Sequence, residues 1–248
     1  MEQKNERTTR EKIARVVSLI TITPFQIIAY ITFARTITTS LIPIIILDLL
    51  NSLFFLIIPS LSLVYVYLEF VKKRKVRVKG AGVLREHRWI MFILAFITYF
   101  VAFGSYFIIQ QSFQLNMIPF FQFINVLLLI NIFDCVLTFG PTKFKTSMHM
   151  SGGTGSIMII YLTLGHLWFL LYCFLPLIFW ARWESKGHTI PQLISGTVIG
   201  IFVPLIYFFI YDVLLTTVVI SSLILIEFVV FIIRDKFPDI EYEDGDKK

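Results

Sequence analysis

Long runs of apolar residues, separated by short polar connections, dominate this chain. We count eight such runs, and most of them reach the ~20 residues that a helix needs to cross ~30 Å of hydrocarbon. A β-barrel would show short alternating segments in place of unbroken runs. The pattern predicts an all-α fold, a polytopic transmembrane bundle of about eight spans. The runs cover roughly residues 15–35, 43–69, 89–110, 117–139, 150–165, 167–181, 189–210 and 213–234.

The composition agrees with a membrane bundle. Of 248 residues, 57% are hydrophobic and 15% are charged, and a soluble domain of this size could not enclose so much apolar surface in one core. The dipeptide Gly165-His166 is all that separates the fifth run from the sixth, which indicates a tight turn or a re-entrant pair. We expect a cytoplasmic N-terminal segment over 1–14, the bundle over 15–234, and a disordered acidic tail over 235–248.

The net charge of +6 is concentrated beside the spans rather than spread along the chain. Much of the excess lies in "VKKRKVRVKGAGVLREHR" and in the first fifteen residues, where membrane topology and anionic headgroups account for it. We therefore expect membrane lipids as partners, and no nucleic acid. Every second connection is basic, as eight spans with both termini inside require. The prediction is a multi-pass protein of the plasma or cytoplasmic membrane with both termini cytoplasmic.

Two polar segments should emerge on the same face of the membrane and converge there. They are residues 140–153, "GPTKFKTSMHMSGG", and residues 182–192, "RWESKGHTIPQ". Cations, two histidines and a Ser-Gly-Gly turn entering a helix describe a site for an anion such as phosphate. Cys135 and Cys173 lie inside apolar runs, so we expect no metal site. The candidate residues are Lys143, Lys145, Ser147, His149, Ser151, Arg182, Lys186 and His188.

Ionisable residues within the apolar runs form a second group of interest. Asp48, Asp134 and Glu227 are costly there and usually face the interior of a bundle. The run that contains Asp134 leads directly into Lys145. Asp134 either pairs with a cation of the site or makes a structural hydrogen bond.

The spacing of the second segment carries a resemblance to a known family. Arg182-x5-His188-x3-Gln192-x3-Gly196 resembles the third signature of the type 2 phosphatidic acid phosphatases, R-x5-H-x3-D with a glycine four residues on. The pair Ser151-Gly152 resembles their second signature, P-S-G-H. The resemblance covers about 143–200. It implies a six-helix phosphatase-like core with the first two spans as an addition, a histidine nucleophile at His188, and phosphate binding by Arg182.

Three positions depart from the family's pattern, and each changes an expected role. Gly153 replaces the histidine of the second signature, and His149 shares its helix face from four residues earlier, so we expect His149 as the general acid. Lys143 or Lys145 would supply the lysine of the first signature. Gln192 replaces the aspartate that orients the nucleophile; its oxygen can still accept a hydrogen bond from the Nδ1–H of His188, and the lost charge should cost on the order of 10²-fold in rate.

The expected function is hydrolysis of a lipid phosphate without metal or cofactor. His188 would form a phosphohistidine, and Lys143, Lys145, Ser147, Ser151, Gly152 and Arg182 would hold the phosphate of a polyprenyl diphosphate, polyprenyl monophosphate or phosphatidic-acid-like lipid. Attack requires a neutral His188, so activity should fall as the pH drops through its pKa. Two alternatives remain open: a phosphotransferase on the same scaffold, and a non-catalytic lipid-binding or transport protein.

Overall fold

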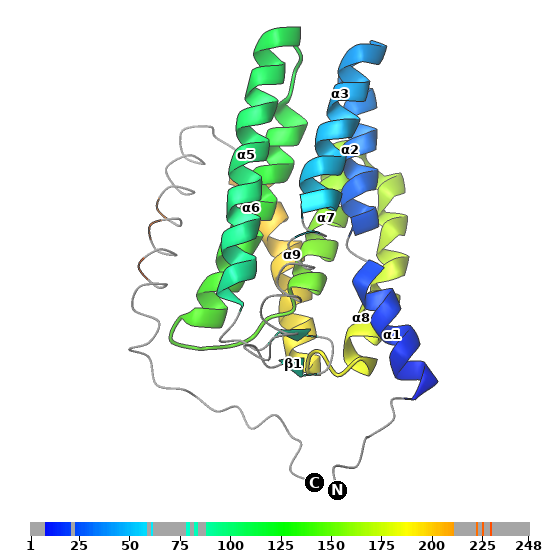
Figure 1. Ribbon diagram of the computed structural model, residues 1–248, viewed down its shortest axis with the longest axis vertical. Helices are drawn as coiled ribbons and strands as arrows, with labels where there is room; N and C mark the ends of the chain where they lie inside the picture. Colours follow the sequence, from blue (N-terminus) through cyan, green and yellow to red (C-terminus); the bar gives the residue numbers. More distant parts are fainter. Residues whose placement is uncertain are drawn as a thin grey trace, which may run out of the picture.

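The structure is a computed structural model that describes residues 8–20, 23–58, 61, 78–79, 82–83 and 88–210, together with positions 222, 225 and 229. Within these ranges the chain is helical apart from turns and one pair of two-residue strands (Figure 1). The helices are α1 (Thr9–Ile20), α2 (Thr23–Ile37), α3 (Leu41–Ser52), the π-helical η1 (Leu53–Ile57), α5 (Trp89–Phe113), α6 (Ile118–Phe139), α7 (Met148–Leu164), the 3₁₀-helical η4 (His166–Phe174), α8 (Leu175–Glu184) and α9 (Ile190–Ile210). The strands, β1 (Val78–Lys79) and β2 (Gly82–Val83), pair antiparallel.

The predicted all-α membrane fold is confirmed at this level. Four helical stretches in the described part of the chain are long and apolar enough to cross a membrane. Their surfaces keep large apolar side chains exposed, among them Leu167 and Phe209. We therefore treat the chain as an integral membrane protein. The four stretches are Trp89–Phe113, Ile118–Phe139, His166–Glu184 and Ile190–Phe209.

The expected runs agree best with the structure where the apolar sequence is unbroken. The runs 89–110, 117–139 and 189–210 correspond to α5, α6 and α9 within a few residues, and 150–165 corresponds to α7. Gly165, with φ of 101°, ends α7 directly before η4, as the expected tight turn requires.

The first expected run, 15–35, is divided between two helices. α1 ends at Ile20 and α2 begins at Thr23, with Pro24 in the first turn of α2, where a missing N–H is tolerated. α3 and η1 cover the first part of 43–69. Most of the run 213–234, the end of 43–69 and the acidic tail 235–248 lie outside the described residues.

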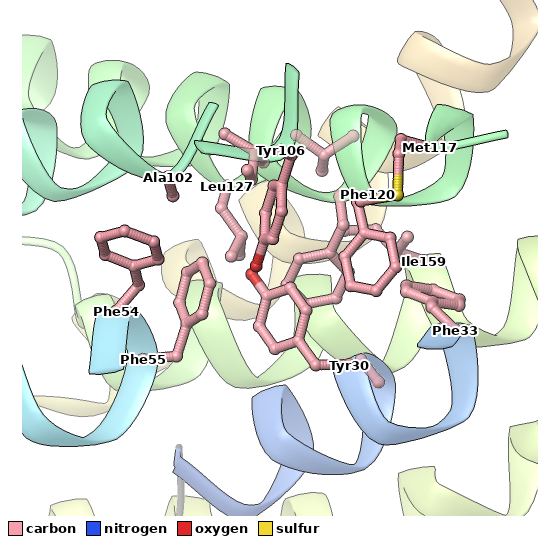
Figure 2. Packing of buried hydrophobic residues seen from close by; sticks show 14 of the residues in the cluster. Tyr30, Phe33, Phe54, Phe55, Ala102, Tyr106, Met117, Phe120, Leu127 and Ile159 are labelled. Atoms are coloured by element: carbon pink, nitrogen blue, oxygen red, sulfur yellow. The ribbon is translucent and has the colours of Figure 1, made fainter. Parts of the chain in front are cut away.

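The largest buried cluster joins α2, η1, α5 and α6 through aromatic side chains (Figure 2). Tyr30 stacks on Phe55 with ring centroids 4.1 Å apart, and it meets Phe123 edge-on at 4.8 Å. The Tyr106 hydroxyl donates a hydrogen bond to Asn51 Oδ1 within this core. Aromatic contacts of this kind add to the burial of apolar area and fix how the helices pack. The cluster forms one part of the bundle, and the polar residues of the candidate site lie elsewhere.

Glycines bring α7 and α9 into backbone contact. A Cβ atom placed on Gly200 would lie 2.5 Å from the Ser151 carbonyl oxygen, and one on Gly196 would lie 2.7 Å from the Ser147 carbonyl oxygen. Small residues four apart allow this close approach between membrane helices. The contact lies at the N-terminal half of α7, so it fixes where the start of α7 sits relative to the start of α9.

Candidate functional site

The two polar segments predicted to converge do contact each other. The Ser147 backbone N–H donates to the Gln192 carbonyl oxygen at 3.2 Å, and Lys145 Nζ donates to the Gly187 carbonyl oxygen at 3.5 Å. In Figure 1 the connection from α6 to α7 and the connection from α8 to α9 lie at the same lower end of the bundle. Antiparallel neighbours with short connections place alternate connections at the same end.

His188 is held in one tautomer by its neighbours. The Thr189 backbone N–H donates to Gln192 Oε1 at 3.2 Å, so that side-chain atom is an acceptor, and His188 Nδ1 lies 3.2 Å from the same oxygen. Nδ1 therefore carries the proton. Nε2 lies 3.3 Å from Nη2 of Arg88, and because a guanidinium only donates, Nε2 must accept. The structure thus contains the His188–Gln192 contact that the spacing predicted; its catalytic role stays a prediction.

Arg88 is a residue of the site that the sequence reasoning missed. Its side chain is buried, and Nη1 donates to the Thr146 carbonyl oxygen at 2.8 Å, while Nη2 contacts His188. The basic stretch before α5 predicts only membrane topology and contact with headgroups. The sequence signal that could have indicated a site residue was the position of Arg88 directly before Trp89, at the start of a span. Burial lowers the pKa of Arg88 to about 10, so the side chain remains charged at neutral pH.

Arg182 supplies a second buried guanidinium to the same region. Its Nη1 donates to Ser18 Oγ of α1 at 2.6 Å, and its carbonyl oxygen accepts from the Gly187 N–H at 3.2 Å. Nε of Arg182 and the hydroxyl of Ser147 are among the buried donors that have no hydrogen-bond partner within the described residues. In the same part of the chain, neither Arg88 nor Arg182 forms an ion pair with a carboxylate. Buried donors without acceptors, beside unpaired cations, are typical of an anion-binding site.

The surroundings of His188 favour its neutral form. Burial is the first cause that lowers its pKa well below the usual value, and the charges of Arg88, Arg182 and Lys145 lower it further. A neutral imidazole at pH 7 agrees with the hydrogen bonds described above. His188 is thus an uncharged imidazole whose Nε2 carries a lone pair.

His149 lies in the first turn of α7 and is half-buried. Its imidazole interacts electrostatically with Arg182, Arg88 and His188. Gly153 is one turn further along α7, where an added Cβ would meet Ile178 of α8 at 3.5 Å. The space beside Gly153 therefore belongs to the α7–α8 contact, and His149 approaches the cations from the turn before it.

The segment Ser151-Gly152-Gly153 is helical, whereas we expected a turn that enters a helix. α7 begins at Met148, and the Ser151 N–H already bonds to the Ser147 carbonyl oxygen at 3.0 Å. Backbone donors without a partner inside the helix therefore belong to Met148 and His149, in the first turn. The Ser151 hydroxyl donates to Asp134 at 2.5 Å. Of the two lysines, Lys143 is buried with φ of 43°, and Lys145 is the one that contacts the second segment.

No cluster of three or more His, Cys, Asp or Glu side chains suited to a metal ion occurs in the described ranges. Comparison with models of protein families, with curated proteins and with solved structures finds no match. The functional assignment therefore rests on the residues of the site and on their geometry.

Proposed function

We propose that this chain is an integral membrane phosphatase that hydrolyses a lipid phosphate or diphosphate without a metal ion, through a phosphohistidine on His188. The observation that supports it most is the geometry of that histidine. Gln192 keeps the proton on Nδ1, and the lone pair of Nε2 is directed at the guanidinium of Arg88. A nucleophile for phosphorus needs such a lone pair, and a phosphate that binds Arg88 would meet it directly.

The phosphate would be held by donors from three parts of the chain. Arg88 and Arg182 offer forked N–H groups, and Arg182 Nε and the Ser147 hydroxyl are buried donors that have no partner within the described residues. Lys145 adds a third positive charge from the connection before α7. The partial positive charge at the N-terminus of α7 acts in the same direction. Since these groups are fixed by packing, they would also stabilise the charge that develops in the transition state.

The reaction follows as two displacements at phosphorus. Nε2 of His188 attacks, the bond from phosphorus to the bridging oxygen breaks, and His149 gives its proton to that oxygen. The bound phosphate dianion favours the protonated form of His149 that this step needs. In the second displacement His149 takes a proton from water, the water oxygen attacks phosphorus, and the electron pair of the P–N bond returns to Nε2. Inorganic phosphate leaves, and both histidines regain their starting states.

The position of the site suggests what the substrate looks like. Arg88 precedes one candidate span, Arg182 lies near the end of another, and His188 lies before a third, so the site is at one lip of the bundle. A lipid with its phosphate at the interface and its chain among apolar helices fits this place. We propose a polyprenyl (di)phosphate or a phosphatidic-acid-like lipid. The chain would have eight spans, including the six-helix core that the resemblance implies, with both termini and the site on the cytoplasmic side of the plasma membrane.

The test is phosphate release by purified protein in detergent with EDTA present. Farnesyl diphosphate and phosphatidic acid are the substrates, and His188→Ala and His149→Ala are the variants. His166→Ala is the matched control, because His166 is exposed at the opposite end of α7, where it contacts the Tyr161 hydroxyl. We expect release that is lost in both site variants and kept in the control. Lipid binding without release of phosphate contradicts hydrolysis. In that case, transfer of phosphate to an added acceptor lipid identifies a phosphotransferase, and the absence of any product identifies a lipid-binding protein.

A further inference from the structure

Asp134 is a buried acid that the proposed reaction does not use. It lies in the apolar helix α6 and its side chain is 1% exposed. Both carboxylate oxygens accept hydrogen bonds: Oδ1 from the Thr146 hydroxyl at 2.6 Å and Oδ2 from the Ser151 hydroxyl at 2.5 Å. Among the described residues no cation is ion-paired with it. An acid buried at such a cost, and bound by two hydroxyl groups, has a specific role in holding them.

The two hydroxyl groups stand on either side of the start of α7. Ser147 is the N-cap residue, so Thr146 precedes the cap and Ser151 is the fourth residue of the helix. Ser147 makes no side-chain cap hydrogen bond. The Asp134 carboxylate of α6 therefore bridges the residue before the N-cap and the fourth residue of the helix. In other helices, contact between two apolar side chains often links the same two positions. Ser147 and His149 lie between these two anchors, so Asp134 fixes the turn that carries them.

The contacts continue from Thr146 to the nucleophile. The Thr146 carbonyl oxygen accepts from Arg88 Nη1 at 2.8 Å, and Nη2 of the same guanidinium contacts His188 Nε2 at 3.3 Å. Thr146 is thus bound on one side by the Asp134 carboxylate and on the other by Arg88. The negative charge of Asp134 also acts favourably on Arg88. A shift of Thr146 would move Arg88 relative to Nε2.

We propose that Asp134 is a positioning residue: through Thr146 it sets Arg88 against His188, and through Ser151 it sets the first turn of α7. The predicted effect of Asp134 on the reaction rate rests on the proposed function, whereas its predicted effect on the position of Arg88 relative to His188 does not. Groups that orient catalytic residues from behind typically contribute about 10- to 100-fold to activity. The hydrogen bonds of Asp134 are to Thr146 and Ser151, so it acts on Arg88 and His188 through these residues.

The variants separate the two hydrogen bonds and the charge. Thr146→Val removes the hydroxyl on the Arg88 side and keeps the shape of the side chain, whereas Ser151→Ala removes the hydroxyl on the α7 side. Asp134→Asn keeps one acceptor and gains a donor, and since a hydroxyl can both donate and accept, both hydrogen bonds can remain. Asp134→Leu removes both. Asp48→Asn is the matched control, because Asp48 is also an acid in an apolar helix and pairs with Arg35, away from the site.

The first measurement is nitrogen-15 histidine spectroscopy of the full chain in detergent. The chain has four histidines, so His188→Gln assigns the signals of interest. We expect Thr146→Val and Asp134→Leu to shift the Nε2 signal of His188, while Ser151→Ala, Asp134→Asn and Asp48→Asn leave it near its wild-type position. An unchanged Nε2 signal in Thr146→Val and Asp134→Leu, with each protein folded, would overturn the proposal.

The second measurement is the rate of phosphate release. Here kcat should fall about 10- to 100-fold in Thr146→Val, with partial activity kept in Asp134→Asn and wild-type activity in Asp48→Asn. If wild type releases no phosphate, the proposed function fails while the spectroscopic test of positioning still stands. A wild-type kcat in Thr146→Val with a shifted Nε2 signal would overturn the role of Asp134 in the reaction.

Discussion

Replacing Gly200 by alanine tests the contact that brings the two halves of the site together. The added Cβ would lie 2.5 Å from the Ser151 carbonyl oxygen, 2.8 Å from Thr154 Cβ and 2.9 Å from the Gly155 backbone nitrogen. Two of these three neighbours are backbone atoms, which cannot rotate away. α7 and α9 would have to separate, and overpacking of this kind costs about 1–3 kcal/mol.

A second glycine provides the control for this substitution. Gly104 lies inside α5, and a Cβ placed on it meets no atom within 4 Å. Both substitutions gain about 0.8–1 kcal/mol because alanine favours a helix more than glycine does. The difference in unfolding free energy between Gly200→Ala and Gly104→Ala therefore isolates the clash, and it should be about 1–3 kcal/mol.

Thermal unfolding in detergent measures this difference. For a chain of this size, 1 kcal/mol shifts Tm by about 2–4 °C, so Gly200→Ala should melt about 2–12 °C below Gly104→Ala. Phosphate release should fall in the same variant, because the Ser147–Gln192 hydrogen bond joins the two helix starts. Equal Tm values for the two variants would refute the close contact of α7 with α9.

Three further predictions concern the site itself. Gln192→Glu restores a negative charge beside His188 Nδ1 and should raise kcat by up to about 100-fold, and a slower Gln192→Glu at every pH would contradict the orienting role. Because the pKa of His188 in the folded protein lies well below its usual value of about 6.5, activity should fall only at a pH well below 6.5. The unfolded chain binds the proton first, so Tm should fall as the pH drops below about 6.5, and His188→Gln should lose the contribution of His188 to this fall. Arg88→Gln should lower kcat/KM on the order of 100-fold, because Arg88 contacts His188 Nε2. The control Arg10→Gln removes a largely exposed ion pair with Glu184 and should change kcat/KM by no more than about two-fold; equal effects of the two substitutions would show that Arg88 does not belong to the site.

Much of the helical framework was predictable because its signals are local in the sequence. α5, α6 and α9 are long apolar runs with polar ends, so hydrophobicity alone fixes them within a few residues. The His188–Gln192 contact spans four residues, a distance that local geometry determines. The meeting of residues 140–153 with residues 182–192 followed from counting alternate connections.

The missed features depend on contacts between residues far apart in the chain. Arg88 and His188 are separated by 100 residues, and no local pattern distinguishes Arg88 from the other cations that precede α5. The Ser-Gly-Gly segment looked like a turn because glycine favours turns. In the bundle, close packing of small residues against α9 and the hydrogen bond from Ser151 to Asp134 keep the segment helical. Tertiary contacts here outweigh local preference.

The central claim is that His188 becomes covalently phosphorylated, and one measurement tests it directly. Purified protein is mixed with a lipid labelled on the phosphorus that is transferred, and the reaction is stopped in alkali, where phosphohistidine survives. The account predicts acid-labile label on the peptide that contains His188, and no label in His188→Ala. With a substrate whose leaving group needs no protonation, His149→Ala should accumulate more label, because it lacks the base that activates water for the second displacement. Release of phosphate by the wild type with no label on that peptide at any time would contradict it.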